Sequence, residues 1–171
     1  MLKISNKKGI SAIVATVLII LITVAAVTII WAAIIPLVAN QLEASTVCLD
    51  ATKQLSLPDA GYTCTNTTDT YFQIKRGGDD AGITDIQVIF SKDDGSSSSA
   101  MLLGDVAMHG VFLSGGTTFT EIPGVNEITT YDANTTHGAD TVSLSVAPVV
   151  MIGNEQKICE VAATVRPGVC A

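Results

Sequence analysis

The sequence predicts an α+β protein in which a long hydrophobic helix at the N-terminus precedes a domain of antiparallel strands. The stretch from Gly9 to Leu42 contains no charged residue. From Val47 onward, short runs that alternate apolar and polar residues are separated by turn residues, with no helical pattern among them. Period-2 alternation marks strands with one buried face. Residues 47–171 are therefore predicted to form an antiparallel β-sandwich or barrel.

The helix is predicted from an apolar run that is long enough to cross a membrane. About 18 or more apolar residues in a row are typical of a membrane span, because every backbone N–H and C=O in lipid must find a partner within the segment. Residues 10–38 would form a helix of roughly 44 Å, whereas the hydrocarbon core of a bilayer is about 30 Å thick. The helix therefore either tilts strongly or has a second role outside the bilayer. Residues 40–46 are expected to continue it as a more polar neck.

Two residues near the end of this helix carry separate expectations. Trp31 is expected either to anchor at the outer membrane interface or to pack between helices. Pro36 is expected to bend or loosen the helix, because proline lacks the backbone N–H and clashes one turn back. Small residues along the helix would let a second helix approach closely. They are Ser11, Ala12, Ala15, Thr16, Ala25, Ala26, Ala32 and Ala33.

Charge is distributed unevenly along the chain. Three of the nine basic residues, Lys3, Lys7 and Lys8, precede the helix, so the part from Glu43 onward has six basic and 16 acidic residues, a net charge of −10. Basic residues that flank a span stay in the cytoplasm. Residues 1–8 are therefore predicted to lie inside and residues 43–171 outside. The acidic domain also argues against nucleic-acid binding, which needs Lys and Arg to neutralise phosphates.

The strands of the predicted domain follow from alternation and from the turns that separate them. The predicted strands include Phe72–Lys75, Ile86–Phe90, Thr117–Ile122, Ile128–Tyr131, Val142–Val146 and Lys157–Val165. The serine run Ser96–Ser99, which follows Asp93-Asp94-Gly95, is predicted to be an exposed hairpin tip.

Four cysteines, Cys48, Cys64, Cys159 and Cys170, all fall in the part predicted to lie outside. An even number of cysteines in an extracellular domain predicts disulfides, and free thiols are the alternative. Four cysteines allow three pairings, and spacing favours two local loops, Cys48–Cys64 and Cys159–Cys170. The chain has no Cys-x-x-Cys pair, so zinc binding and thioredoxin-like chemistry have little support.

Two asparagines lie in glycosylation sequons, Asn66-Thr67-Thr68 and Asn134-Thr135-Thr136. Both sequons occur in polar, turn-rich surroundings, which suits a secreted surface. Asn66 and Asn134 are therefore candidate N-glycosylation sites, and chance occurrence of this short pattern is the alternative.

No motif predicts catalysis, a cofactor or a metal. The two histidines, His109 and His137, are not in a metal-ligand spacing. Carboxylates on the turns at Asp79-Asp80 and Asp93-Asp94 could offer oxygen ligands to Ca²⁺, but neither turn matches a calcium loop. Asp-Gly turns are also ordinary hairpin chemistry. The expectation is a non-enzymatic protein without a cofactor.

The N-terminus resembles a known family. Lys7-Lys8-Gly9 followed by Ile10–Leu18 is similar to the N-terminus of archaeal type IV pilins and the wider archaellin and pilin group. In that family a prepilin peptidase cuts after the glycine of a basic-basic-Gly motif. The resemblance implies that residues 1–9 are a class III signal peptide and that the mature chain begins at Ile10. Bacterial type IV pilins usually carry Glu at the fifth mature position, and Val14 here fits the archaeal branch better.

The resemblance also implies a function and an architecture. It implies a structural subunit whose helix and neck, residues 10–46, span the membrane first and later pack in the core of a helical filament. The head, residues 47–171, would be an extracellular immunoglobulin-like β-sandwich. Looser similarity to archaeal pilin heads covers Pro123–Glu127 and Ala147–Cys159.

Partners and alternatives follow from the same resemblance. The implied partners are identical subunits in an adhesive homopolymer, the prepilin peptidase, a pilus assembly ATPase, a membrane platform protein and an oligosaccharyltransferase. One alternative is an archaellin of a motility filament. Another is an uncleaved single-span surface protein whose β-domain binds a ligand. Major and minor subunits are not separated by these residues.

Overall fold

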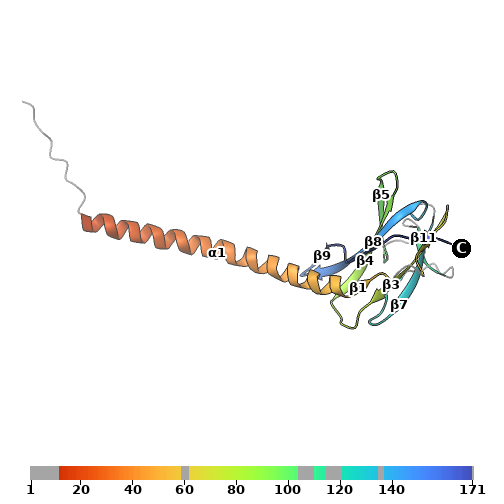
Figure 1. Cartoon of the computed structure of the whole chain (residues 1–171). Coiled ribbons are helices and arrows are strands. Elements are labelled where there is room, and N and C mark those ends of the chain that lie inside the picture. Colours follow the sequence, from red (N-terminus) through yellow and green to blue (C-terminus); the bar gives the residue numbers. More distant parts are fainter. Residues whose placement is uncertain (1–11, 59–61, 104–109, 115–120, 135–136, 171) are drawn as a thin grey trace, which may run out of the picture. The chain divides into compact units, whose positions relative to one another are not determined.

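A computed structural model of the chain describes residues 12–58, 62–103, 110–114, 121–134 and 137–170. The chain divides into two units, Met1–Leu42 and Glu43–Ala171 (Figure 1). The second unit, called the body below, contains the end of the helix and all the described strands. The predicted α+β class is confirmed: one long helix precedes a β-rich body.

The predicted helix is confirmed and is longer than expected. Helix α1 spans Ala12–Lys53, so it continues past the neck that was expected to end at Thr46. The added turns continue a face that is already buried at Ala44: Val47 and Cys48 are half-buried in the body, and Ala51 is buried. This spacing of three and four residues is the repeat of an amphipathic helix.

Pro36 does not end α1, which runs through it as a single element. The absent N–H of proline leaves the carbonyl of Ala32 without its usual helical partner. One helical hydrogen bond is therefore missing, and α1 still continues as one unbroken helix (Figure 1).

Within the described residues, the first sheet of the body has six strands. Their pairing order is β11-β2-β3-β7-β6, and β1 also pairs with β3. All pairs are antiparallel except β11 with β2, which is parallel. The strands are β1 (Leu55–Ser56), β2 (Cys64–Thr65), β3 (Thr70–Arg76), β6 (Val111–Leu113), β7 (Ile128–Ala133) and β11 (Gly168–Val169).

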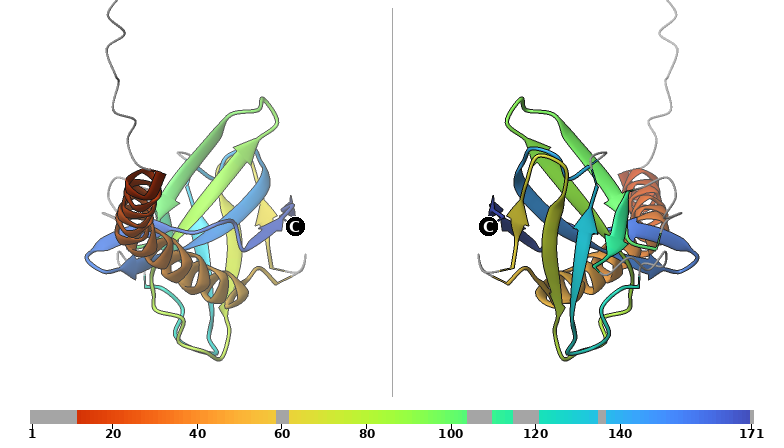
Figure 2. Two further views of the ribbon diagram at one scale, coloured as in Figure 1. Left: turned by 90° about the vertical axis from the view of Figure 1, so that its left-hand side faces the viewer. Right: turned by 90° about the vertical axis from the view of Figure 1, so that its right-hand side faces the viewer.

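Within the described residues, the second sheet has five strands. Its order is β10-β8-β4-β5, and β9 also pairs with β8; every pair is antiparallel. Figure 2 shows β4, β5 and β8 as neighbouring strands. The strands are β4 (Ile83–Lys92), β5 (Ser97–Met101), β8 (Thr141–Ile152), β9 (Glu155–Ile158) and β10 (Ala163–Val165).

Both sheets contribute to one hydrophobic core. Phe72 of β3 lies edge-on to Phe90 of β4, with ring centroids 5.9 Å apart, and stacks on Tyr131 of β7 at 5.5 Å. All three rings are fully buried. The buried hydroxyl of Tyr131 donates a hydrogen bond to the carbonyl of Glu121, so no polar group in this aromatic cluster is left unsatisfied by burial of the ring.

Four predicted strands are confirmed. Phe72–Lys75 lies in β3, Ile86–Phe90 in β4, Ile128–Tyr131 in β7 and Val142–Val146 in β8. Most of their apolar side chains are buried in the core, whereas Ile128 of β7 and Val142 of β8 are 50% and 43% exposed. In β3, β4 and β8 the alternation therefore identified the buried face of the strand.

The predicted strand Lys157–Val165 is interrupted in the structure. It forms β9 and β10, which both pair with β8 and are separated by Cys159–Ala162. The interruption lies opposite Pro148 of β8, which has no N–H to donate to a neighbouring strand. The N–H of Cys159 still donates to the carbonyl of Pro148 at 2.9 Å.

The expectation for the serine run was wrong, and the predicted strand Thr117–Ile122 lies partly outside the described residues. The hairpin between β4 and β5 turns at Asp93–Ser96, and Ser97–Ser99 belong to β5 rather than to its tip. The side chain of Asp94 accepts the backbone N–H of Ser96 at 2.8 Å, which closes the turn before the serine run. Of the predicted strand Thr117–Ile122, residues 117–120 lie outside the described residues, and 121–122 are not in a strand.

Candidate functional site: an apolar helix surface and a cross-linked body

The first candidate site is the surface of α1 within the unit Met1–Leu42. Every side chain described between Ala12 and Leu42 is exposed, and the apolar residues lie on all sides of the helix. By length and composition this helix could cross a membrane. A helix that is apolar on all sides needs cover all round, from lipid or from other helices. Residues 12–42 span roughly 46 Å, which is more than the roughly 30 Å of a hydrocarbon core.

The hydroxyl groups of this helix are satisfied within it. Thr16, Thr23 and Thr28 each donate a hydrogen bond to the carbonyl three residues earlier, all at 2.9 Å. Such bonds remove the cost of placing a hydroxyl where water is absent. The three threonines therefore present methyl groups to their surroundings and need no outside polar partner.

A shallow apolar hollow surrounds Trp31, whose side chain is 63% exposed. The hollow has a volume of about 440 Å³ and is lined by Ile30, Trp31, Ile34, Ile35, Val38, Ala39 and Leu42. An indole ring beside such a hollow suits either of its two expected roles, at a membrane interface or between packed helices.

The predicted processing junction, Lys7, Lys8, Gly9 and Ile10, lies outside the described residues. Cleavage after Gly9 therefore stays a prediction from the sequence.

All four cysteines are cross-linked in the body, which confirms the predicted disulfides. The favoured local pairing was wrong. Cys48 pairs with Cys159 and Cys64 with Cys170, with Cα–Cα distances of 5.3 Å and 4.9 Å. The spacing of two cysteines along the chain indicates only the entropic cost of closing the loop between them. The fold instead brings the last strands beside the first elements, and no feature of the sequence indicated this pairing.

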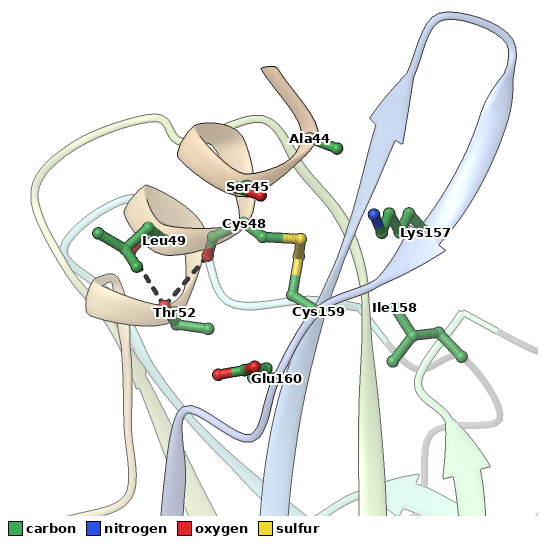
Figure 3. A pocket seen from close by; sticks show the side chains of 9 residues that line it. All are labelled: Ala44, Ser45, Cys48, Leu49, Thr52, Lys157, Ile158, Cys159 and Glu160. Carbon is green, nitrogen blue, oxygen red and sulfur yellow. Dashed lines mark hydrogen bonds between the residues drawn. A yellow bond between two sulfur atoms is a disulfide. The ribbon is translucent and has the colours of Figure 1, made fainter. Parts of the chain in front are cut away.

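The Cys48–Cys159 bond ties the end of α1 to the interruption between β9 and β10 (Figure 3). It borders a cavity of about 250 Å³ whose lining includes Leu49, Thr52, Lys157 and Glu160. The Thr52 hydroxyl donates to helix carbonyls, that of Cys48 at 3.1 Å and that of Leu49 at 3.0 Å. The Thr52 hydroxyl is therefore engaged within the helix.

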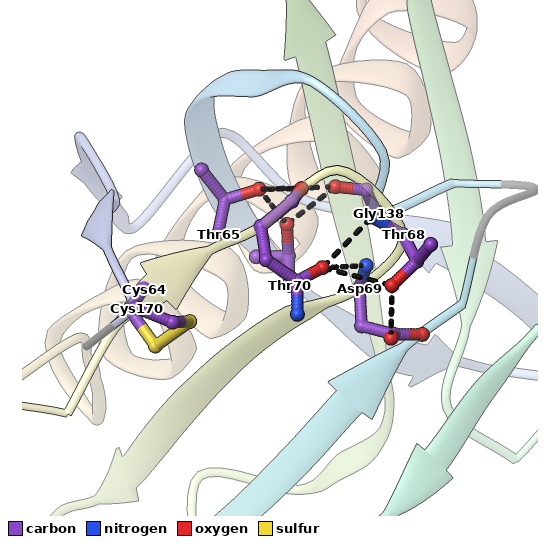
Figure 4. Close-up of a disulfide and its surroundings, with 8 residues drawn as sticks. Cys64, Thr65, Thr68, Asp69, Thr70, Gly138 and Cys170 are labelled. Atoms are coloured by element: carbon purple, nitrogen blue, oxygen red, sulfur yellow. Dashed lines mark hydrogen bonds between the residues drawn. A yellow bond between two sulfur atoms is a disulfide. The ribbon is translucent and has the colours of Figure 1, made fainter.

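The Cys64–Cys170 bond fastens the C-terminal strand to the first sheet (Figure 4). Beside it, the N–H of Gly168 donates to Thr63 and that of Cys170 to Thr65, both at 3.1 Å. Strands β2 and β11 contain only two residues each, so these bonds and the disulfide supply most of the attachment. The disulfide thus attaches the segment that follows β11 to the first sheet covalently.

A cluster of three threonines lies next to this disulfide. The backbone carbonyl of Gly138 accepts hydrogen bonds from the hydroxyls of Thr65, Thr70 and Thr141. Gly138 and Thr70 are buried, so this carbonyl is the acceptor that makes burial of these hydroxyls tolerable.

The two sequons differ in their surroundings. Asn66 is exposed in the turn between β2 and β3, and its side-chain carbonyl accepts the N–H and the hydroxyl of Thr68 at 2.8 and 3.0 Å. Asn134 is half-buried, and its side-chain oxygen lies against the backbone of Gly110. Thr135 and Thr136 lie outside the described residues. Asn66 is therefore the more accessible of the two acceptor asparagines.

Charged groups of the body show two opposite pKa shifts. Partial burial raises the pKa of the Asp132 carboxyl, and the nearby charge of Asp69 raises it further. The pKa of Asp94 is lowered by hydrogen bonds from Ser96. Asp132 lies in β7 between β3 and β6, and Asp94 lies in the turn between β4 and β5.

Among the described residues, no group of three or more His, Cys, Asp or Glu side chains could hold a metal ion. The turn carboxylates considered for Ca²⁺ have other contacts: Asp79 accepts from Gln54 at 3.3 Å and Asp80 pairs with Arg76 at 2.8 Å. His137 stacks on Phe90 at 5.8 Å, and His109 lies outside the described residues.

Comparisons with known proteins add no assignment. No protein-family model matches the chain, and no curated protein matches it.

Proposed function

We propose that this protein is a structural subunit of an archaeal type IV pilus that polymerises through α1 into an adhesive surface filament. The observation that carries the proposal is the exposed surface of Ala12–Leu42, which is uncharged, apolar on all sides and longer than a bilayer is thick. Lipid covers such a helix only along about 30 Å. A strong tilt would bring more of the helix into lipid, and in an upright helix the remainder needs cover from other helices.

Packing of α1 against copies of itself supplies that cover. Burial of apolar surface stabilises by about 25 cal/mol per Å², so a contact along the whole helix carries a large driving force. Alanine and threonine along α1 let neighbouring backbones approach, and the internally bonded hydroxyls of Thr16, Thr23 and Thr28 need no water in such a core. Repetition of one head-to-tail contact without closure gives a helical filament.

Processing and assembly would use the partners that the N-terminal resemblance implies. A prepilin peptidase would cut between Gly9 and Ile10, and an assembly ATPase with a membrane platform protein would move the subunit from the membrane into the filament. The positive charge of Lys7 and Lys8 would hold the uncut end in the cytoplasm.

The body would be displayed on the outside of the filament. Two disulfides and an exposed sequon at Asn66 suit an extracellular surface and an oligosaccharyltransferase. Two sheets around one core are compatible with the immunoglobulin-like β-sandwich that the resemblance implies, and we include that finer fold in the proposal.

The test is the N-terminus and the location of the native protein. Mass spectrometry of a sheared cell-surface fraction should find a chain that begins at Ile10 in sedimentable filaments. Gly9→Val should leave the precursor uncut and in the membrane, whereas Asn6→Ala, outside the motif, should be processed normally.

Other outcomes identify the alternatives. A chain that begins at Met1 or Leu2 and occurs only in membranes would overturn the proposal in favour of a single-span surface protein with a binding domain. Filaments that rotate and drive swimming would identify an archaellin instead of an adhesive pilin.

A further inference from the structure

The two disulfides are interleaved along the chain. The cysteines occur in the order Cys48, Cys64, Cys159 and Cys170, and the first pairs with the third while the second pairs with the fourth. The bonded residues are 111 and 106 positions apart. No native bond joins cysteines that are neighbours in this order.

An unfolded chain favours the opposite pairing. The chance that two residues of a flexible chain meet falls roughly as the −3/2 power of their separation. On that scaling Cys48 meets Cys64 about 20-fold more often than Cys159, and Cys170 meets Cys159 about 30-fold more often than Cys64. Oxidation before folding would therefore produce two local, non-native loops.

Emergence of the chain at the outer face of the membrane adds to this bias. If the N-terminus stays inside, Cys48 and Cys64 reach the outside before Cys159 and Cys170. Synthesis at about 5–20 residues per second leaves several seconds in which only the first two are exposed. A Cys48–Cys64 bond is then the only intramolecular disulfide that the chain can form.

Cys64 and Cys170 are held together by little local structure before they are bonded. Cys64 and Cys170 belong to or follow strands of two residues each, and Cys159 lies in the interruption between β9 and β10. Strands this short are marginal without further support. The reduced body therefore offers little to prevent the early local bond.

We propose that the body matures by thiol–disulfide exchange and that its partner is a dithiol exchange catalyst on the outer face of the membrane. The thiolate of Cys159 attacks Cys48 in the local Cys48–Cys64 bond, forms the native bond and releases the thiolate of Cys64. The catalyst performs the same exchange through a mixed disulfide with Cys48. No net oxidation occurs in this step.

The second native bond then needs one oxidation. Cys64 and Cys170 lose two protons and two electrons to a disulfide oxidant such as glutathione disulfide, which becomes two thiols. The inference depends on the interleaved pairing and not on polymerisation, so it stands or falls separately from the proposed filament.

The experiment compares two oxidants on the full chain in detergent micelles. The chain is fully reduced in denaturant, and denaturant removal and oxidation begin together. One sample receives a glutathione redox buffer, which permits exchange. The other receives a selenoxide, which converts two thiols to a disulfide and is itself reduced to selenide, with release of water and without a thiol that could promote exchange.

Digestion with trypsin without reduction separates the pairings. Trypsin cuts after Lys53, Lys75 and Lys157, while Arg166-Pro167 resists it. Native bonds link three peptides, which carry Cys48, Cys64 and the pair Cys159 with Cys170. Local bonds give one linked pair and one internally looped peptide. Cleavage after Glu160 then distinguishes the native pairing from the remaining crossed one.

We expect at least a fivefold higher native yield in the glutathione buffer than with the selenoxide, and faster recovery when a protein disulfide isomerase is added. The double variant Cys48→Ser/Cys159→Ser is the control: it has a single pair, so both oxidants should close Cys64–Cys170 equally well. Equal native yields of the unaltered chain with both oxidants would overturn the proposal.

Discussion

At the scale of single residues, Gly138 is the described glycine at which an added Cβ atom would lie nearest to another atom. A Cβ atom there would lie 2.1 Å from the carbonyl oxygen of Ala133 and 2.8 Å from the N–H nitrogen of Thr70, and both are backbone atoms of paired strands. Gly138→Ala should lower the free energy of unfolding by about 2 kcal/mol or more, because the strands must separate to admit the methyl group.

Chemical denaturation of the full chain in detergent measures the effect of Gly138→Ala, with unfolding of the body monitored by circular dichroism. The matched control is Gly168→Ala, since the nearest atom to a Cβ at Gly168 is the carbonyl of Thr63 at 4.0 Å and its φ angle is not positive. That variant should change stability by less than about 0.5 kcal/mol. Equal losses for both variants would contradict the packing argument.

Asp132 carries a pH-dependent cost of folding. Burial and then the charge of Asp69 raise its pKa in the folded state above the ordinary value of 3.8. The folded protein therefore holds this proton more tightly than the unfolded chain, and stability falls as pH rises from about 4 through the raised pKa. Asp132→Asn should be more stable than the unaltered chain at pH 7, and the difference should vanish in acid.

Asp94 provides a control of opposite sign. Hydrogen bonds from Ser96 lower its pKa, so its ionised form favours folding above the ordinary pKa and that contribution is lost in acid. Asp94→Asn should therefore be slightly less stable at pH 7. Urea denaturation between pH 3 and 7 compares the variants, and a gain at pH 7 from Asp94→Asn would contradict these assignments.

At the scale of elements, the end of α1 is the part that belongs to the body. Ala51 is fully buried against the core, whereas Leu49 is 60% exposed on the other side of the same turn. Ala51→Leu adds volume to a filled site and should lower the free energy of unfolding by about 1–3 kcal/mol. Leu49→Ala should change it by less than about 0.5 kcal/mol. A reversed order of the two losses in chemical denaturation would show that the helix end packs differently.

Local patterns predicted those elements whose burial is set by local alternation. Strands β3, β4 and β8 were found because alternate side chains of their predicted stretches enter the core. The end of α1 was missed, although Ala44, Val47, Cys48 and Ala51 have helical spacing, because small residues give a weak hydrophobic pattern. The serine run was assigned to a loop because its composition is polar, but tertiary pairing with β4 makes it a strand.

The pairing of the cysteines could not be predicted from local patterns. Spacing predicts which thiols meet in an unfolded chain, and the native bonds instead follow from sheet topology. Parallel pairing of β11 with β2 brings Cys170 to Cys64, and pairing of β9 and β10 with β8 positions Cys159 near α1. The same long-range information decides which sequon is accessible, because Asn134 packs on Gly110.

At the scale of the whole molecule, the two units suit different surroundings. The unit Met1–Leu42 has no acidic residue and an exposed apolar helix, while the body has all 16 acidic residues and a closed core. An apolar helix surface of this length is unstable in water and must always be covered. If only lipid covers this helix, the protein is a membrane anchor; if copies of the helix cover it, the protein is a filament subunit.

One substitution near the middle of the apolar helix separates these two functions. Val24→Lys costs about 2.5–3.5 kcal/mol in a membrane span, which the other apolar residues of α1 outweigh at about 0.3–0.6 kcal/mol each. The precursor should therefore still insert. In a filament the same lysine would be buried among packed helices without a partner, so the sedimentable filament fraction should fall at least tenfold.

The matched control is Leu49→Lys, which places the same charge at an exposed position of the body. Sedimentation of sheared surface material and extraction of membranes measure both variants. Filaments from Val24→Lys at the unaltered level would contradict burial of α1 in a polymer core. Loss of Val24→Lys from membranes would show that insertion, rather than assembly, limits the protein. Unaltered membrane retention together with lost filaments is the combination that a subunit polymerised through α1 requires.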